Sequence, residues 1–261
     1  MGKLLKKFNN EYILFKKQYK IILFSLFFFI YVISTIARNL AYYRHVQLEP
    51  LRDIGFEIFP KIDESFISEI FLGVNIFIFI TILLRPLMTD NNNNVYIINM
   101  SIRLMNINCI LRFLRSISYL STALPSTSEH CLIGSDTYNP PNRDEIFTRF
   151  NSLFDKNCGD MLFSGHYSFE LTLCLFAQRY LPKLSTNKLL NHIIIITMWL
   201  ITIAHGFILI AVRNHYTVDI VVAIYTTILL WYVYENYYPT DIQLPVNMSE
   251  SSHQDHPTSI V

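Results

Sequence analysis

The hydrophobic positions of the chain gather in six long runs, and polar or charged segments separate these runs. A helix needs about 20 mostly apolar residues to cross the hydrocarbon core of a bilayer. The runs therefore predict an all-α, polytopic membrane protein with six transmembrane helices. We place the spans at residues 21–36 (extended by Tyr19 and Ala37), 66–84, 95–114, 161–181, 190–212 and 216–234.

Prolines and polar residues qualify three of these spans. The second span is expected to end at Arg85-Pro86 and the fourth before Pro182, because proline interrupts helical hydrogen bonding. The third run carries five polar or charged residues that must face protein or a wet cavity if the segment crosses the membrane. These residues are Asn99, Arg103, Asn106, Asn108 and Arg112.

Composition supports the membrane interpretation. Hydrophobic residues make up 52% of the chain and charged residues only 16%, whereas soluble domains carry about 25% charged residues. This balance excludes a soluble globular enzyme, a disordered chain and a nucleic-acid-binding protein with a basic face. The formal net charge of +1 points to no charged partner.

Three regions follow from this pattern. Residues 1–20 hold six lysines and form a basic N-terminal segment. Residues 21–238 form the six-span membrane domain, and residues 239–261 form a polar tail predicted to be disordered. Lys and Arg divide evenly between the two sides, so the orientation rests on the first helix and places both terminal regions in the cytosol.

The four cysteines fall into two classes. Cys131 and Cys158 share one loop on the predicted exoplasmic side, where oxidising conditions allow a disulfide; a bonded pair and two free thiols both remain open. Cys109 and Cys174 lie within spans and are interpreted as packing residues.

Two histidines form the strongest candidate for chemistry. His166 lies near the start of the fourth span and His215 just past the end of the fifth, so antiparallel packing brings them to the same membrane face. Such a pair can act as acid/base and nucleophile. Asp219, one helical turn after His215, can orient its ring, and Arg213 offers planar donors to phosphate.

Other interpretations of these residues stay open. The histidines could be solvated interfacial residues, or they could bind zinc with Asp219. Glu170, one turn after His166, either orients that histidine or makes an interhelical contact, including a pairing with Arg103 or Arg112. His205 is expected to make a helix–helix hydrogen bond.

The motifs resemble a known family. Ser164-Gly165-His166 followed by His215-x-x-x-Asp219 resembles the type 2 phosphatidic acid phosphatase superfamily. The strings CGDMLFSGHY (158–167) and RNHYTVD (213–219) resemble the two catalytic motifs of the sphingomyelin synthase family. Residues 115–125 resemble a third family motif, and residues 50–57 resemble the first motif less closely.

This resemblance implies a lipid phosphatase-like helical core and a transferase of the Golgi or plasma membrane, with its active site facing the lumen or the exterior. It implies transfer of phosphocholine from phosphatidylcholine to the primary hydroxyl of ceramide, giving sphingomyelin and diacylglycerol, without metal or other cofactor. His215 would form a phosphohistidine supported by Asp219, and His166 would act as acid and then base. The residues expected to bind substrate are Arg213, Ser164, Gly165, Asp160, Arg115 and Tyr119.

Several alternatives accompany this prediction. Ethanolamine- and inositol-transferring synthases share the motifs, a lipid phosphate phosphatase would use the same histidines, and a non-catalytic lipid-binding protein would need neither. The chain also departs from the pattern: Leu209 stands where phosphatases of the superfamily have an arginine, and Arg52 stands where the family has a second proline in its first motif. The oligomeric state, including a homodimer, stays open.

Overall fold

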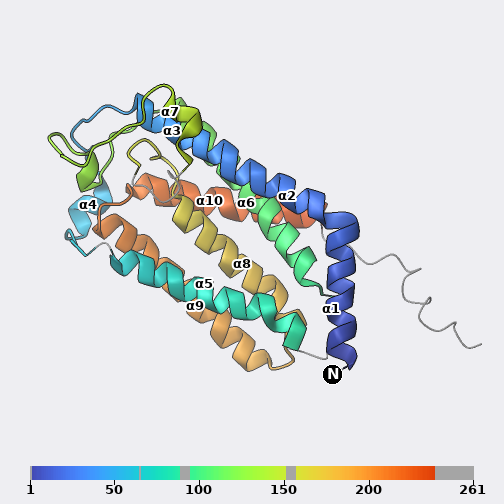
Figure 1. The fold of residues 1–261 in the computed structure, drawn as a ribbon. Helices are drawn as coiled ribbons and strands as arrows, with labels where there is room; N and C mark the ends of the chain where they lie inside the picture. The colour runs from blue at the N-terminus through green and yellow to red at the C-terminus, as the bar shows by residue number, and fades with distance from the viewer. Residues whose placement is uncertain (1, 65, 89–94, 151–156, 239–261) are drawn as a thin grey trace, which may run out of the picture.

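The computed structural model describes residues 2–64, 66–88, 95–150 and 157–238, and the described residues form helices and turns without strands. Long helices lie side by side in one bundle (Figure 1). The longer elements are α1 (Gly2–Leu14), α2 (Lys20–Phe28), α3 (Ser34–Arg44), α5 (Phe66–Met88), α6 (Ile97–Ser121), α8 (Gly165–Leu184), α9 (Lys188–Ala211) and α10 (Thr217–Tyr237). The short ones are α4 (Ile54–Ile58), α7 (Glu145–Thr148), a 3₁₀ turn (Glu129–Cys131) and two π-helical turns (Phe15–Tyr19 and Phe29–Ile33).

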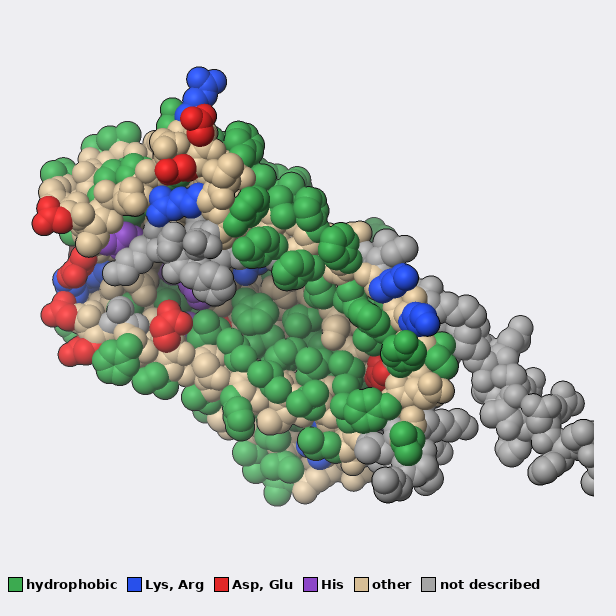
Figure 2. Space-filling view, viewed as in Figure 1, with side chains coloured by type: hydrophobic (Ala, Val, Ile, Leu, Met, Phe, Trp, Pro, Cys, Tyr) green, Lys and Arg blue, Asp and Glu red, His purple; other side chains and the backbone are tan. Residues whose placement is uncertain are grey.

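Five helices of the described chain are long and apolar enough to cross a membrane. They cover Ile22–Arg44, Phe66–Met88, Ile97–Ser121, Lys188–Ala211 and Thr217–Tyr237. Hydrophobic side chains cover the middle of the bundle in the space-filling view, as expected for a surface that faces lipid (Figure 2). These observations confirm an all-α, multi-pass membrane protein, while the count of six spans stays a prediction.

Helix α8 corresponds to the fourth predicted span, and it occupies the centre of the bundle. It packs against α5 and α9 on one side and against α6 and α10 on the other (Figure 1). Its Ser168, Glu170 and Thr172 are buried. Because neighbouring helices supply partners for such side chains, α8 can be long enough to span and yet less apolar than the helices around it.

Several predicted helix ends are wrong by four residues or more. The first helix continues beyond the predicted end at Ala37 to Arg44. In this extension the Asn39 Nδ2 donates to the carbonyls of Ile146 and Arg149, both at 3.0 Å, so a distant loop supplies partners for it. Helices α5 and α8 also continue through Pro86 and Pro182. Each proline lies in the last turn, and its helix ends two residues later, at Met88 and Leu184.

The basic N-terminal segment, predicted only as a charged stretch, forms a helix through residue 14 and a π-helical turn beyond it. Glu11 of α1 accepts hydrogen bonds from the N–H groups of Ile97 and Ile98, at 2.6 and 3.2 Å. These are orphan donors at the start of α6, so Glu11 caps that helix from another part of the chain. The predicted tail, residues 239–261, lies outside the described residues.

The segment between α6 and α8 closes one end of the bundle and is fixed by a disulfide. Cys131 bonds to Cys158, which confirms the pairing that the sequence left open. Cys109 and Cys174 are free and buried, as expected of packing residues. The disulfide places the CGD sequence beside α3, where Gly159 lies so close to the backbone of Ala41 that a Cβ would come within 2.3 Å of it.

Candidate active site

The start of α8 carries the first histidine. Ser164 is the N-cap of this helix, and its Oγ accepts the Tyr167 N–H at 3.3 Å. Gly165 is the first helical residue, and His166 follows in the first turn with an exposed side chain. A helix N-terminus presents unpaired N–H groups and a partial positive charge, which together favour an anionic group.

The turn between α9 and α10 carries the second histidine. The N–H groups of Asn214 and His215 both donate to the Leu209 carbonyl, which fixes this turn. His215 Nδ1 lies 2.9 Å from Oδ2 of Asp219 in the first turn of α10. Asp219 is fully buried, whereas His215 keeps 7% of its surface exposed. The contact between this carboxylate and the His215 ring, expected from their spacing, is therefore present.

Asp219 also ties the two histidine motifs together. Its Oδ1 accepts the Leu162 N–H at 2.9 Å, and its backbone carbonyl accepts the Ser164 N–H at 3.2 Å. Leu162 reaches this position with a positive φ of 84°, a conformation that costs energy for a residue with a branched side chain. The start of α8 and the start of α10 therefore meet at one end of the bundle, as predicted.

Charged groups converge on the exposed histidine. His166 lies close enough to His215, Asp160, Arg115 and Arg38 for the charge of each to act on its ring. Two imidazoles, a partly buried carboxylate and two guanidinium groups thus share one site. In the space-filling view, His, basic and acidic side chains gather at this end of the molecule, away from the hydrophobic middle (Figure 2).

A cluster of one buried and two partly buried charged residues supports the start of α8. Arg115 of α6 donates through Nε to the Phe163 carbonyl at 2.7 Å and through NH2 to Oδ2 of Asp160 at 2.6 Å. Arg38 of α3 lies 3.3 Å from the same Asp160 oxygen. Burial alone would raise the pKa of the Asp160 carboxyl, but Arg115 and Arg38 outweigh it and hold that pKa well below its usual range.

Gly165 allows this guanidinium to approach the helix. A Cβ at Gly165 would come within 3.2 Å of Cζ and Nε of Arg115. On the other side of the guanidinium, the Tyr119 ring lies 5.4 Å from Cζ, and the Tyr119 hydroxyl bonds Ser116. Tyr119 is buried and touches Arg115, so it acts on the site through the arginine.

Arg213 turns toward another element. Its NH2 donates to the carbonyls of Phe56 and Phe59 at 3.0 and 3.1 Å, and its guanidinium stacks 4.2 Å above the Phe56 ring. Arg213, which the sequence predicted as a phosphate ligand, therefore joins α4 to the turn between α9 and α10.

The other two sequence motifs hold the same turn. Asp53 accepts hydrogen bonds from the Thr217 N–H at 3.0 Å and from its hydroxyl at 2.6 Å. Gly55 packs so closely there that a Cβ would lie 2.3 Å from Thr217 Oγ1. The Tyr216 hydroxyl donates to the Pro125 carbonyl and accepts the Leu51 N–H, both at 3.0 Å. All four motifs therefore meet around the histidines.

Comparison with known proteins agrees with this geometry. Residues 157–236 match the family described as PAP2 superfamily C-terminal. A phosphatidylinositol:ceramide inositolphosphotransferase of Oryza sativa subsp. japonica is 32% identical over 220 residues, which cover 81% of this chain and 64% of the rice protein. Phosphatidylinositol:ceramide inositolphosphotransferase 3 of Arabidopsis thaliana is 30% identical over 255 residues, covering 95% of this chain and 82% of the plant protein.

The chain belongs to the sphingomyelin synthase family of the PAP2 superfamily. A shorter similarity links it to phosphatidylcholine:ceramide cholinephosphotransferase 1 of Homo sapiens, 38% identical over 76 residues, or 29% of this chain and 17% of the human protein. The chain spans 64% of the length of the rice relative.

Two features distinguish this member from the superfamily pattern. Leu209, at the position of a phosphatase arginine, is buried and packs in the core, and its carbonyl holds the His215 turn. Positive charge beside the histidines comes instead from Arg115 and from Arg38. Sequence patterns do not predict Arg38 as part of the site, because its partner Asp160 lies 122 residues further along the chain and gives no local signal.

Glu170 makes an interhelical contact and does not orient His166. Its Oε2 lies 2.5 Å from Nδ1 of His205 on α9, and its Oε1 accepts from Asn75 of α5. Asn75 also donates to Thr202 at 3.0 Å. The helix–helix hydrogen bond predicted for His205 is therefore confirmed, and of the two interpretations of Glu170 the structural one holds.

Among the described residues, one group has the spacing of a metal site: His130, Cys131 and Cys158. Both thiols of this group are joined in the disulfide, which leaves a single imidazole.

Proposed function

We propose that this protein transfers the phospho-headgroup of a glycerophospholipid to the primary hydroxyl of ceramide and releases diacylglycerol. The observation that carries the proposal is the contact of His215 Nδ1 with buried Asp219, at 2.9 Å, beside exposed His166. When Nδ1 donates to the carboxylate, the lone pair of the neutral ring lies on Nε2, which can attack phosphorus.

In the first step, His215 Nε2 forms a bond to phosphorus while the bond from phosphorus to the diacylglycerol oxygen breaks. Protonated His166 donates its proton to that oxygen, and the headgroup phosphate remains on His215. Asp219 stabilises the positive charge that develops on the His215 ring. Since Asp219 is fully buried, its charge acts through a medium of low dielectric constant and is poorly screened.

In the second step, neutral His166 takes the proton from the primary hydroxyl of ceramide, and the ceramide oxygen attacks phosphorus. The nitrogen–phosphorus bond breaks and returns His215 to its starting form. Water could open the same intermediate, so transfer requires that ceramide is held in line and that water is scarce. A site at the end of a lipid-facing bundle gives lipid hydroxyls direct access.

The phosphate is best held by the start of α8 together with the guanidinium of Arg115. The N–H groups of Gly165 and His166 are in the first turn, and Arg115 lies against that turn. In this proposal Ser164, Asp160 and Tyr119 are positioning residues: Ser164 caps α8, and the other two hold Arg115. Arg213 would act by fixing the His215 turn.

The disulfide supports an active site that faces the lumen or the exterior. Cys158 lies two residues before Asp160, at the same end of the bundle as the histidines. Disulfides persist in oxidising compartments and are rare in the cytosol. This orientation agrees with the one drawn from the lysine-rich N-terminus; residence in the Golgi or the plasma membrane stays a prediction.

Phosphoinositol is the headgroup that similarity favours. The alignments with the two plant relatives cover 81% and 95% of this chain, and both relatives are named as inositolphosphotransferases. The alignment with the human cholinephosphotransferase covers only 29% of this chain. We therefore place phosphatidylinositol ahead of the phosphatidylcholine that the motifs alone suggested. Phosphatidylcholine remains the second candidate, because the 76-residue segment aligned with the human cholinephosphotransferase is 38% identical to it.

The test uses purified protein in detergent with fluorescent ceramide and one donor at a time: phosphatidylinositol, phosphatidylcholine or phosphatidylethanolamine. Thin-layer chromatography and mass spectrometry then identify the labelled product. We expect inositol phosphorylceramide from phosphatidylinositol, and loss of product in His215→Ala. His192→Ala is the matched control, because His192 is exposed at the other end of α9.

Each remaining outcome contradicts part of the proposal. Product from phosphatidylcholine alone would reverse the headgroup assignment and retain the transferase. Free phosphate from phosphatidic acid without transfer to ceramide would identify a phosphatase. Equal transfer by wild type and His215→Ala would exclude His215 as the nucleophile, and absence of product from every donor would exclude the enzymatic function.

A further inference from the structure

Arg112 of α6 is a charged residue that the reaction proposed above does not use. Helix α6 is long and apolar enough to cross a membrane, and Arg112 lies nine residues before its end at Ser121. The side chain is partly buried. No described residue forms a hydrogen bond or an ion pair with its guanidinium. A charge within a span is costly unless it is paired, so an unpaired arginine at this depth indicates a functional site.

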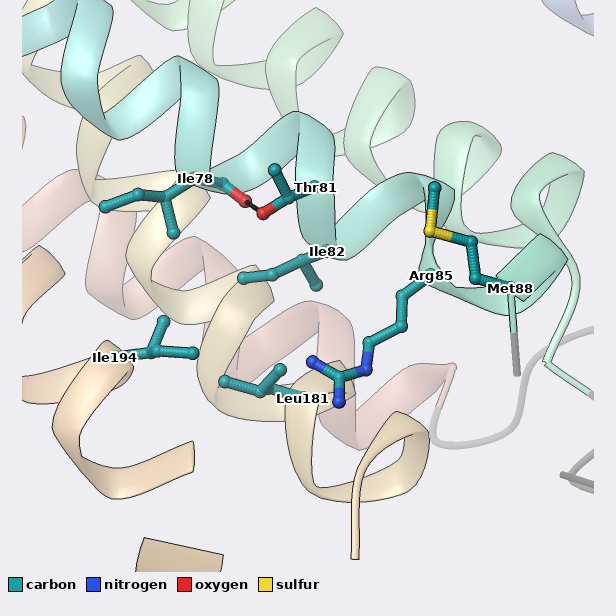
Figure 3. Close-up of a pocket in the computed structure, with 7 residues that line it drawn as sticks. All are labelled: Ile78, Thr81, Ile82, Arg85, Met88, Leu181 and Ile194. Carbon is teal, nitrogen blue, oxygen red and sulfur yellow. Dashed lines mark hydrogen bonds between the residues drawn. The ribbon is translucent and has the colours of Figure 1, made fainter. Parts of the chain in front are cut away.

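Arginines toward the opposite end of the long helices differ from Arg112 because they have partners. Arg103 of α6 and Arg179 of α8 both bond the carboxylate of Glu235 on α10. Arg85, near the end of α5, also has an interaction partner, and its side chain extends across a groove between α5 and α8 (Figure 3). These three arginines are therefore accounted for by contacts within the chain, and Arg112 is not.

The acids that could pair with Arg112 are occupied, and its charged neighbours are cations. Glu170, which the sequence offered as a partner, is bonded within the contact of α8 with α5 and α9. Asp160 is shared by Arg115 and Arg38. The positive charges of these same two arginines act on Arg112. Because like charges repel, the position is unfavourable until an anion joins the three guanidinium groups.

Arg112 lies beside the groups that hold the start of α8. It precedes Arg115 by three residues, so the two side chains are on the same face of α6 and about 4.5 Å apart along the helix axis. Arg115 and Arg38 act on the ring of His166 as well as on Arg112. A long, flexible arginine side chain can bridge one helical turn, so its guanidinium can reach a phosphate held at the start of α8.

The charges of the site favour an anionic donor. Arg38, Arg112 and Arg115 carry three positive charges. Asp160 and Asp219, which both act on Arg115, carry two negative charges. One positive charge is therefore left over when both imidazoles are neutral, and one phosphodiester neutralises it. Phosphatidylinositol brings no other charge, whereas phosphatidylcholine brings a quaternary amine that the guanidinium groups repel.

We propose that Arg112 is a further substrate-binding residue, which contacts the anionic phosphate of the lipid donor and favours donors with a net negative charge. Its guanidinium presents planar donors to phosphate oxygens, and the bound phosphate offsets the repulsion among the three arginines. This inference rests on the proposed function, since the phosphate in question is the one transferred to His215.

The kinetic test compares wild type with Arg112→Gln in mixed micelles of detergent, phosphatidylinositol and fluorescent ceramide. We expect the KM for phosphatidylinositol to rise about tenfold, with little change in kcat or in the KM for ceramide. The melting temperature of the substrate-free protein should stay the same or rise, because a repulsion is removed and no partner is left unpaired. Arg143→Gln is the matched control: Arg143 is an exposed cation in the loop at the same end of the bundle, and both quantities should stay unchanged.

A binding measurement without ceramide separates this inference from the proposed function. Phosphatidylinositol should raise the melting temperature of His215→Ala, which cannot form the phosphohistidine, and the addition of Arg112→Gln should abolish this stabilisation. Neither phosphatidylcholine nor inorganic phosphate should reproduce it. If wild type transfers no headgroup but phosphatidylinositol still binds through Arg112, the proposed function fails and the binding role stands.

Three results would overturn the binding role. The first is an unchanged KM for phosphatidylinositol or unchanged stabilisation by it in the Arg112→Gln variants. The second is equal stabilisation of His215→Ala by phosphatidylcholine or by inorganic phosphate. The third is a lowered melting temperature of substrate-free Arg112→Gln and Arg112→Met, or failure of both to fold, because either would show that the guanidinium has a structural role.

Discussion

Nδ1 of His215 lies 2.9 Å from Oδ2 of Asp219, one helical turn further along the chain. The same carboxylate accepts the backbone N–H groups of Leu162 and Tyr216, at 2.9 and 3.1 Å. Three donors therefore fix its position, and the carboxylate in turn selects the ring tautomer. The nucleophile proposed for this enzyme depends on that selection more than on any other single contact.

Asp219→Asn should reduce kcat by up to about 10⁴-fold with little change in KM. An amide at this position can donate to Nδ1 and thereby favour the tautomer whose lone pair is on the wrong nitrogen. Initial rates of transfer to fluorescent ceramide measure this effect. Asp53→Asn is the comparison, because Asp53 holds the same turn through Thr217 but does not touch the histidine; it should lose stability and retain most of its kcat. A near-normal kcat in Asp219→Asn would contradict the proposed role.

The charge balance of Asp160 with Arg115 and Arg38 gives a second prediction. Asp160→Asn leaves the buried guanidinium of Arg115 and the partly buried one of Arg38 without their shared carboxylate; breaking a fully buried pair costs about 3–5 kcal/mol, which is the upper end expected here. The melting temperature should fall, and removing one cation as well, in Arg38→Gln/Asp160→Asn, should restore part of it. A double-mutant cycle with Arg38→Gln measures the coupling. Strictly additive effects would show that Arg38 and Asp160 do not interact energetically.

The pKa of Asp160 determines the pH range of this contribution. Arg115 and Arg38 hold the folded-state pKa below its usual range, so the unfolded chain takes up a proton first as the pH falls. The stabilisation is therefore fully present above the unfolded pKa of about 3.9 and is lost as the pH falls toward the folded value. Between pH 5 and 8 the Asp160 carboxyl stays ionised in both states and its own titration adds no pH dependence to the stability difference between wild type and Asp160→Asn.

Sequence patterns predicted the helices and the histidine pair because both depend on local signals. Hydrophobic runs locate spans, and the spacing from His215 to Asp219 is one helical turn. The helix ends were harder to predict: α3 continues through Arg38 and Asn39, whose partners come from a loop more than 100 residues away. Such partners are invisible to a pattern read along the chain.

The roles of polar motif residues show the same limit. Arg213 was predicted as a phosphate ligand from its nearness to His215 in sequence, yet it bonds the carbonyls of Phe56 and Phe59. Its backbone has a positive φ of 57°, which turns the side chain away from the direction that a regular helix end would give. A composition or spacing rule carries no information on such a turn.

The disulfide should be important for both stability and activity. Cys131 and Cys158 are 27 residues apart, and closing a loop of this length stabilises a fold by about 3.5 kcal/mol in the chain-entropy estimate. Reduction should lower the melting temperature and slow transfer, because Cys158 leads directly into Asp160 and Leu162. The Cys131→Ser/Cys158→Ser variant controls for other effects of the reductant and should not respond to it. Unchanged wild-type melting under complete reduction would contradict this prediction.

Glu170 and His205 should contribute to stability and not to the chemical step. Both side chains are almost fully buried, and they join α8 to α9 with Asn75 of α5 as a third partner. Glu170→Gln weakens a charge-assisted hydrogen bond in a low-dielectric environment, so the free energy of unfolding should fall by about 2 kcal/mol.

If Glu170 instead oriented His166, the variant would shift the acid or base limb of the pH–rate profile. We expect that profile to stay unchanged in Glu170→Gln, in contrast to a His166→Gln variant. Thermal unfolding and pH–rate measurements on the same preparations separate the two roles, and strong non-additivity between Glu170→Gln and His205→Gln would locate the lost energy in their contact.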